Sequence, residues 1–354
     1  MAEQQKKNIF LVKFEPSSDF TTYSSLGIAD EEVIHEFNLA RIIECELTDE
    51  RVDDLKRFSN VLYVERDIPV YAYQQEIPYG VSRVQTQQVH QEGYTGGGVK
   101  LGIVDTGIDA SHEDLNVTDG FSVFQSGEDS EPYHDGSGHG THVAGTAAAL
   151  DNGTGVVGVA PDASLYAIKV LDSSGSGSSA GVVRGIEWAI QNEMDVINMS
   201  LGSSEPSRAI QDAVDTAYDE YDILVVAAAG NEGNADGTGN TVGYPAQHDS
   251  VLSVAATDQN DLRAPFSSTG PGVDISAPGA SILSTVPGNG YDRLNGTSMA
   301  APHVAGAGAV LRAAFPDAPA SEIKERMIST AKDIGDRSEW YGSGLLQLHD
   351  AVNQ

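Results

Sequence analysis

The stretch Leu294-Asn295-Gly296-Thr297-Ser298-Met299-Ala300-Ala301-Pro302-His303-Val304-Ala305-Gly306 combines a serine with a run of small and apolar residues. Small and apolar residues continue to Leu311, so a helix that begins near Ser298 would be buried on most of its faces. Pro302 is compatible with it, because proline is tolerated in a first turn. Ser298 is then either an N-cap or a nucleophile at the positive end of the helix dipole. The second interpretation requires a base, an orienting acid and another oxyanion donor elsewhere in the chain.

The composition is that of an acidic globular protein. The 354 residues are 40% hydrophobic and include 38 glycines, which fits a compact α/β protein with a sizeable core. The formal net charge of −32 argues against nucleic acid and anionic membranes as partners. No apolar run is long enough to span a bilayer, and residues 1–7 lack the apolar segment of a signal peptide. Either the stability depends on salt, which would screen the repulsion and make the protein halotolerant, or the charge only keeps an acidic surface soluble.

The first seventy residues predict a small α+β domain. Strand patterns cover residues 8–14, 41–47 and 60–65, and helical patterns cover 30–36 and 48–58. This alternation is typical of a ferredoxin-like sandwich. The only cysteine, Cys45, excludes an intramolecular disulfide, and we interpret it as a packed strand residue rather than a thiol nucleophile.

The pattern changes after residues 70–80, which have little periodicity and end in turn residues. Apolar strands are predicted at 99–104, 164–171, 195–200 and 223–228, and a helix at 180–191. Repeated strands and helices of this kind predict an α/β fold with a doubly wound, mostly parallel sheet. We therefore expect a domain boundary within residues 70–80.

Four polar residues stand where these elements begin or end. Asp105 and Asn231 each follow an apolar strand, while His139 and Ser298 each begin a helix of small residues. In a parallel sheet the strand ends and the following helix starts lie on one edge, so the four side chains can converge. Acyl transfer needs such a base, carboxylate, amide donor and hydroxyl. Asp105 alone could simply cap a turn, but the set together favours catalysis.

Four blocks resemble the signature motifs of the subtilases, and they occur in subtilase order: 104–109, 139–145, 229–231 and 296–303. The resemblance covers nearly the whole chain. It implies a subtilisin-like α/β/α catalytic domain and a serine endopeptidase that acts through an acyl-enzyme. Ser298 would be the nucleophile with its hydroxyl bound to His139, the general base, and Asp105 would orient His139. Asn231 would donate to the oxyanion beside the Ser298 N–H.

The same resemblance implies how polypeptide substrates bind. One edge would pair with substrate through Gly175, Ser176 and Gly177, and the other through Ser200, Leu201 and Gly202. The remaining contacts of the specificity pocket would be Ala227, Gly230, Glu232 and Gly243. Because glycine at 243 leaves room for a large side chain, we expect Tyr, Phe, Leu or Met before the scissile bond, with Glu232 adding some tolerance for a basic one. The Tyr244–Pro245 bond is expected to be cis.

Residues 150–156 read alone as an Asn-Gly turn, but they also resemble the strong calcium loop of the subtilisins. A structural Ca²⁺ would then be held by side chains and carbonyls of Gln75, Asp114, Leu150, Asn152, Thr154 and Val156.

Residues 1–73 resemble a subtilisin propeptide, an intramolecular inhibitor and folding chaperone, and 74–354 would be the catalytic domain. Autoprocessing is expected near Tyr73-Gln74, since Tyr73 suits the predicted pocket. Alternatively, residues 1–73 form an independent binding module. We expect a monomer that is secreted after loss of a signal peptide not included in this sequence, or else a cytoplasmic enzyme.

Several competing interpretations have weaker support. Residues 175–180 match a dinucleotide fingerprint, but Asp195 begins its strand and is misplaced for a ribose contact. His142 forms His-x-x-His with His139, yet no zincin glutamate follows, so we expect His142 to be structural. Peptidases with a glutamate base would place Asp where Asn231 stands, and a serine esterase would need Gly-x-Ser-x-Gly around Ser298. A peptide-binding pseudo-protease is disfavoured by the intact set of four polar residues.

Overall fold

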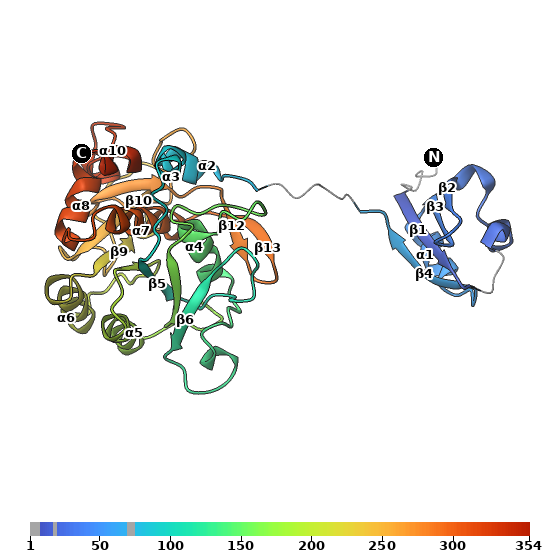
Figure 1. The fold of residues 1–354 in the computed structure, drawn as a ribbon, viewed down its shortest axis with the longest axis horizontal. Helices are drawn as coiled ribbons and strands as arrows, with labels where there is room; N and C mark the ends of the chain where they lie inside the picture. Colours follow the sequence, from blue (N-terminus) through green and yellow to red (C-terminus); the bar gives the residue numbers. More distant parts are fainter. Residues whose placement is uncertain (1–7, 17–19, 69–74) are drawn as a thin grey trace. The chain divides into compact units, whose positions relative to one another are not determined.

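The computed structural model describes residues 8–16, 20–68 and 75–354, and the chain divides into two compact units, Met1–Ala72 and Tyr73–Gln354 (Figure 1). Each unit is described by itself. The expected processing site, Tyr73-Gln74, lies outside the described residues.

The amino-terminal unit contains an antiparallel sheet in the order β2-β3-β1-β4. Its elements are β1 (Asn8–Phe14), β2 (Val33–Phe37), β3 (Ile42–Leu47), β4 (Val61–Arg66), α1 (Asp49–Leu55) and the 3-10 helices η1 (Phe20–Leu26) and η2 (Asp30–Glu32). This strand order is the one expected for a ferredoxin-like sheet. The helix predicted over 30–36 is wrong: it stops after one 3-10 turn, because the chain from Val33 onward pairs with β3.

Alternate residues of the sheet strands form the core of this unit. Phe10, Val12 and Ile43 are buried on one face, and Cys45 is fully buried among them. Burial raises the pKa of the Cys45 thiol to about 12, which suits a packed residue and not a nucleophile.

The carboxy-terminal unit is built on a seven-stranded sheet, and its strand pairs are parallel, as predicted. In spatial order the strands are β11 (Ile275–Pro278), β10 (Val251–Thr257), β9 (Leu224–Ala228), β8 (Val196–Met199), β5 (Lys100–Asp105), β7 (Ser164–Lys169) and β6 (Val117–Ser122). A separate hairpin joins β12 (Ile282–Val286) to β13 (Gly290–Leu294).

Helices cover both faces of this sheet and give three layers. One apolar cluster includes residues of α4 (His139–Ala148) and α7 (Thr297–Ala314), and a second includes residues of α5 (Ser179–Gln191) and α6 (Arg208–Asp215). The strands alternate between the clusters: Val226 and Ala228 belong to the first, Val225 and Ala227 to the second. The remaining helices are α2 (Tyr79–Arg83), α3 (Thr86–Gln91), α8 (Ala320–Ser329), α9 (Ser338–Tyr341), α10 (Leu348–Val352), the 3-10 turn η3 (Glu128–Ser130) and the π turn η4 (Thr216–Glu220).

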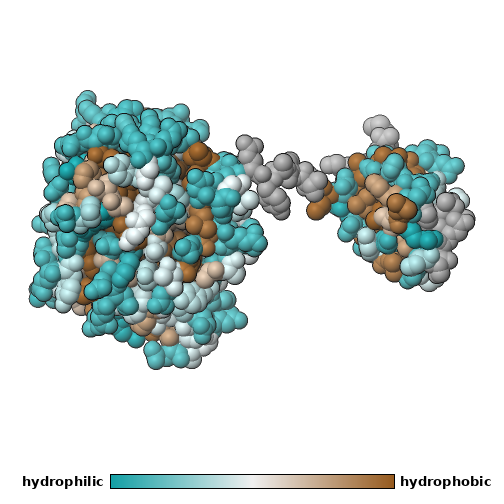
Figure 2. Space-filling model, in the orientation of Figure 1, coloured by the Kyte–Doolittle hydropathy of each residue, from teal (hydrophilic) through white to brown (hydrophobic). Residues whose placement is uncertain are grey.

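The surface of the larger unit is mostly hydrophilic. Hydrophilic residues cover most of the face of the larger unit that is visible in Figure 2. Within the described ranges, no helix is long and apolar enough to cross a membrane.

Candidate active site

Asp105 and His139 are in direct contact where β5 ends and α4 begins. Oδ1 of the fully buried Asp105 lies 2.7 Å from Nδ1 of His139, whose side chain is 28% exposed. Burial disfavours a charge on His139, but the charge and hydrogen bond of Asp105, with the charge of Asp135, outweigh it and raise the pKa of His139 above its usual value. An imidazole that donates from Nδ1 to a carboxylate has a fixed tautomer, which leaves its other nitrogen to act as a base.

The close approach of α4 to β5 depends on two glycines. A Cβ on Gly140 would overlap the carbonyl oxygen of Gly107, and Gly107 itself has a φ of 105°. Gly140 N also donates to Thr106 Oγ1 at 2.9 Å, directly after the strand. These contacts join the strand end to the helix start.

Ser298 is the second residue of α7, as the sequence led us to expect. Its hydroxyl donates to the carbonyl of Ser200 at 3.3 Å and not to His139, so the expected bond between Ser298 and His139 is replaced in this structure. Catalytic hydrogen bonds are often formed only when substrate is present. In the first turn, the Ser298 N–H has no acceptor within the helix and remains available to an oxyanion.

Pro302 is the sixth residue of α7 and not in its first turn, which corrects the sequence-based expectation. Proline has no N–H for the carbonyl of Ser298 four residues earlier. Ser200 Oγ donates to that carbonyl at 2.9 Å and receives a hydrogen bond from Asn198 Nδ2 at 2.9 Å. The residue that follows β8, Ser200, thus supplies the partner that proline removes.

Asn231 is oriented by the start of α7. Its Oδ1 accepts hydrogen bonds from Thr297 N at 2.9 Å and from Thr297 Oγ1 at 3.0 Å. Since a backbone N–H can only donate, the side-chain oxygen must face Thr297, and Nδ2 points away as a donor. The sequence analysis did not assign this orienting role to Thr297. The only indication in the sequence was that an amide at a strand end needs a partner to orient it.

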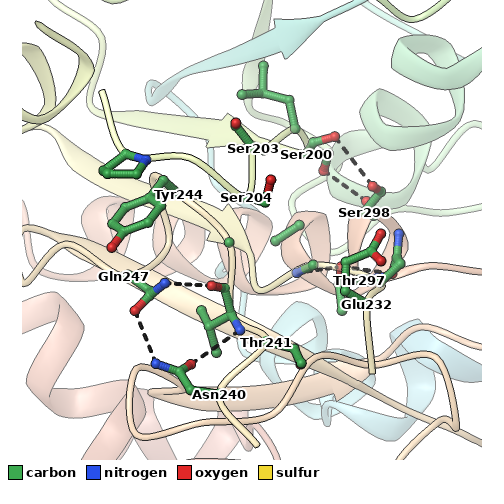
Figure 3. A pocket seen from close by; sticks show the side chains of 18 residues that line it. Ser200, Ser203, Ser204, Glu232, Asn240, Thr241, Tyr244, Gln247, Thr297 and Ser298 are labelled. Atoms are coloured by element: carbon green, nitrogen blue, oxygen red, sulfur yellow. Dashed lines mark hydrogen bonds between the residues drawn. The ribbon is translucent and has the colours of Figure 1, made fainter. Parts of the chain in front are cut away.

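Two adjoining cavities receive these groups. One of about 920 Å³ is lined by Asn231 and Ser298, and the other, of about 530 Å³, by His139. Both share Ser200, Leu201, Gly202, Ser203 and Tyr244. Figure 3 shows the first cavity, with Ser298, Thr297 and Glu232 on one side and Asn240, Gln247 and Tyr244 on the other.

Most of the expected substrate contacts line these cavities. Gly230, Glu232 and Gly243 line the larger one, and a Cβ on Gly243 would come within 3.2 Å of the carbonyl oxygen of Ser203. Ala227 lines neither cavity, because it is fully buried in the apolar cluster that includes residues of α5 and α6. Its neighbour Ala228 lines the larger cavity instead. The error is one residue, because successive strand residues face opposite sides of the sheet.

The two expected substrate edges border the smaller cavity. Gly175, Ser176 and Gly177 line it together with Ser200, Leu201 and Gly202. The first edge starts with a turn, in which Gly175 N donates to Asp172 O at 2.9 Å, and an isolated bridge then pairs Gly177 with Leu171. The extended part therefore begins at Ser176.

Six residues expected to bind a cation gather at one loop. Gln75 Nε2 donates to the carbonyls of Leu150 at 2.6 Å and Val156 at 3.1 Å, and Gln75 Oε1 accepts from Gly153 N. The fully buried Asp114 accepts hydrogen bonds from Asn152 Nδ2 and Val156 N, and Asn152 Oδ1 accepts two from Thr154. Carbonyl, amide and carboxylate oxygens are ligands that Ca²⁺ prefers, so this donor set fits a hard cation.

His142 and His303 are buried structural residues. His142 Nε2 contacts the carbonyls of Ile282 at 2.9 Å and Asp292 at 3.2 Å, and His303 Nδ1 contacts the carbonyl of Met299 at 2.8 Å. Burial lowers the pKa of each to about 4, so both are neutral at pH 7. Within the described residues no cluster of three or more His, Cys, Asp or Glu is placed to hold a metal ion.

Comparison with known proteins points to one family. Residues 96–344 match the model of the subtilase family. Subtilisin E of Bacillus subtilis is 49% identical over 317 residues, covering 90% of this chain and 82% of that protein. Subtilisin DY of Bacillus licheniformis is 56% identical over 278 residues, covering 78% and 99% respectively. The thermostable alkaline protease of Halalkalibacterium halodurans is 47% identical over 352 residues, covering 99% and 94%, so that similarity extends through both units.

Proposed function

This chain belongs to the subtilase family and is a subtilisin-like serine endopeptidase, and from that premise we propose that it is the pro-form, with residues 1–73 as propeptide and 74–354 as catalytic domain. The observation that carries the catalytic assignment is the 2.7 Å contact of Asp105 with His139 beside the cavities that also hold Ser298 and Asn231.

The proposed reaction begins at Ser298. Its Oγ bonds to the carbonyl carbon of the scissile peptide while its proton passes to Nε2 of His139, and Asp105 stabilises the imidazolium. The oxyanion receives hydrogen bonds from the Ser298 N–H and from Asn231 Nδ2. The C–N bond then breaks as His139 returns the proton to the leaving amine. Water, activated by His139, hydrolyses the acyl-enzyme by the same steps in reverse.

The proposed specificity is for Tyr, Phe, Leu or Met before the scissile bond. The larger cavity of about 920 Å³ and the absence of a side chain at Gly243 support it. Profiling on a peptide library checks it, and a preference for Asp, Glu or Gly would contradict it.

The proposed propeptide acts as inhibitor and folding chaperone. Its sheet leaves large apolar side chains exposed, among them Ile34 at 53% and Leu62 at 49%, which supports a surface made to be covered. Hydrophobic residues are visible on this unit in Figure 2. An SDS gel with amino-terminal sequencing compares the active chain with Ser298→Ala. We expect a fragment that begins at or near Gln74 only from the active chain; an uncut active chain with full activity would contradict the proposal.

We also propose a structural Ca²⁺ held by Gln75, Asp114, Leu150, Asn152, Thr154 and Val156. The carbonyl oxygens of Leu150 and Val156, which both face the Gln75 amide, and the nearby carboxylate of Asp114 support it. Exchanging the oxygen and nitrogen of the Gln75 amide would turn a further oxygen toward the ion. The cation stabilises the fold and takes no part in the chemistry. We further propose that the mature enzyme is a secreted monomer that cleaves polypeptides in salt-rich surroundings.

A further inference from the structure

A second carboxylate, Asp135, is linked to the contact between Asp105 and His139 through Thr106. It precedes α4 and is only 6% exposed. Its Oδ1 accepts hydrogen bonds from Thr106 Oγ1 at 2.8 Å and Gly138 N at 2.9 Å, and its Oδ2 accepts from Thr141 N at 2.8 Å and Thr141 Oγ1 at 2.6 Å. With two donors on each oxygen, this carboxylate is held in a single orientation.

Thr106 connects Asp135 to both members of the reacting pair. Its N–H donates to Oδ1 of Asp105 at 2.7 Å, the same oxygen that contacts His139. Its hydroxyl donates to Asp135 and accepts from Gly140 N, the residue after His139. One threonine therefore joins the strand end that carries Asp105 to the helix turn that carries His139.

The geometry points to Asp135 as a positioning residue that sets the contact between Asp105 and His139, through Thr106 on one side and the first turn of α4 on the other. This inference rests on the catalytic roles proposed above for Asp105 and His139. The hydrogen bonds of Asp135 go to Thr106, Gly138 and Thr141, and none goes to a reacting atom. A residue that only capped the helix would stabilise the fold without changing the chemistry.

The pKa of His139 provides a second readout, besides kcat, that a loss of fold stability alone would not change. The charged groups near His139 are Asp105 from β5 and Asp135 from the loop before α4, and Lys169 of β7 donates to the carbonyl of Thr106. His142, one turn further along α4, is neutral. The charge of Asp135 contributes to the raised pKa of His139, so its removal should lower that pKa.

The test compares Asp135→Asn with Asp317→Asn, which removes the same charge from an exposed site beyond the far end of α7. The mature enzyme is quantified by titration of reactive active sites, and kcat and KM are measured on a peptide substrate from pH 5 to 9. In Asp135→Asn we expect kcat to fall about tenfold with KM nearly unchanged, because the base is misplaced. The acid limb of kcat/KM should move down by about half a pH unit. Asp317→Asn should change neither.

A second pair of variants keeps the inference testable if Asp135→Asn does not fold. Thr106→Val removes the connecting hydroxyl, whereas Thr106→Ser retains it. We expect kcat per active site to fall in the valine variant and to stay closer to that of the unmodified enzyme in the serine variant. Asp135→Asn with an unchanged kcat and acid limb, or equal kcat in both Thr106 variants, would overturn the inference. Neither result would affect the proposed function, which fails instead if Ser298→Ala retains turnover.

Discussion

The active edge of the sheet and the loop 150–156 are both made of polar groups that converge from separate parts of the chain, but they are held in different ways. Asp105 is fully buried and accepts a hydrogen bond from Thr106 N. Asn231 accepts one from Thr297 N at the start of α7. In the loop, residues 151–154 are exposed, and the amide of Gln75 bridges carbonyls that would otherwise face one another. The fold preorganises the first site, whereas the proposed cation would have to hold the second in place. Variants at the active edge should therefore change the rate, and variants in the loop should change the stability.

His139→Ala is expected to give the largest effect. Loss of the base should lower kcat/KM by about 10²- to 10⁴-fold while the melting temperature stays nearly constant. Steady-state kinetics and thermal melts of His139→Ala beside His349→Ala, a partly exposed histidine in α10, measure both quantities. A large loss of stability with a small loss of rate would reverse the contrast between the two sites.

Asn231→Leu should have the next largest effect. Removal of one donor to the oxyanion should lower kcat by about 10- to 100-fold, the worth of a hydrogen bond to a charged group, with KM little changed. Asn234→Leu is the matched control, because the Asn234 side chain forms its hydrogen bonds with Thr238 in its own turn. A rise in KM at constant kcat would show that Asn231 binds the ground state instead.

Acid should destabilise the carboxy-terminal unit through two buried histidines, His142 in α4 and His303 in α7. His142 and His303 have pKa values of about 4 in the folded protein, below the usual 6.5, so the unfolded chain binds more protons between these values. Their contribution is fully present above about pH 6.5 and is lost as the pH falls toward 4, by a few kcal/mol in all. Urea unfolding of Ser298→Ala at pH 7 and pH 5 measures the loss. His303→Gln should reduce the pH dependence, and His349→Gln should leave it unchanged; equal stability at both pH values would contradict the assignment.

Calcium should affect stability but not the chemical step. Saturating Ca²⁺ at about 100 times its Kd should add about 3 kcal/mol to the free energy of unfolding, and EDTA should remove it. Asn152→Ala should lose most of this response, whereas Asp162→Asn, an exposed residue outside the loop, should keep it. Melts of Ser298→Ala variants with and without Ca²⁺ avoid self-digestion. An unchanged melting temperature would place the cation elsewhere or exclude it.

Salt should give the smallest effect. At a net charge of −32, molar NaCl should screen repulsion and raise the melting temperature by a few degrees in the presence of saturating Ca²⁺. A melting temperature that stays constant or falls in molar NaCl would contradict salt-dependent stability. The acidic surface would then serve only to keep the protein soluble.

The sequence predicted those parts that follow from periodicity. Apolar runs located β5, β7, β8 and β9, and the helix starts at His139 and Ser298 followed from small-residue runs. Because strand ends and helix starts share an edge, their convergence could also be predicted. The helix over 30–36 could not be excluded, since pairing with β3 is a tertiary contact.

Finer geometry was beyond reach of the sequence. Ala227 and Ala228 differ by one position in an apolar run, and only the packing of both sheet faces decides which lines the cavity. The acceptor of the Ser298 hydroxyl depends on a side-chain rotamer. Asp135 belongs to a glycine-rich loop with no periodicity, so no sequence pattern predicts its contacts with Thr106 and Thr141.

Covalent labelling distinguishes Ser298 as the nucleophile and His139 as its base from any other pair of residues. The mature enzyme and His139→Ala are treated with equal doses of an aryl sulfonyl fluoride, and the modified residue is located by peptide mass spectrometry. We expect one sulfonyl group per active enzyme, on Ser298, with activity lost in proportion, and almost no label in His139→Ala. Stoichiometric labelling of another residue, or full activity after Ser298 is modified, would contradict these roles.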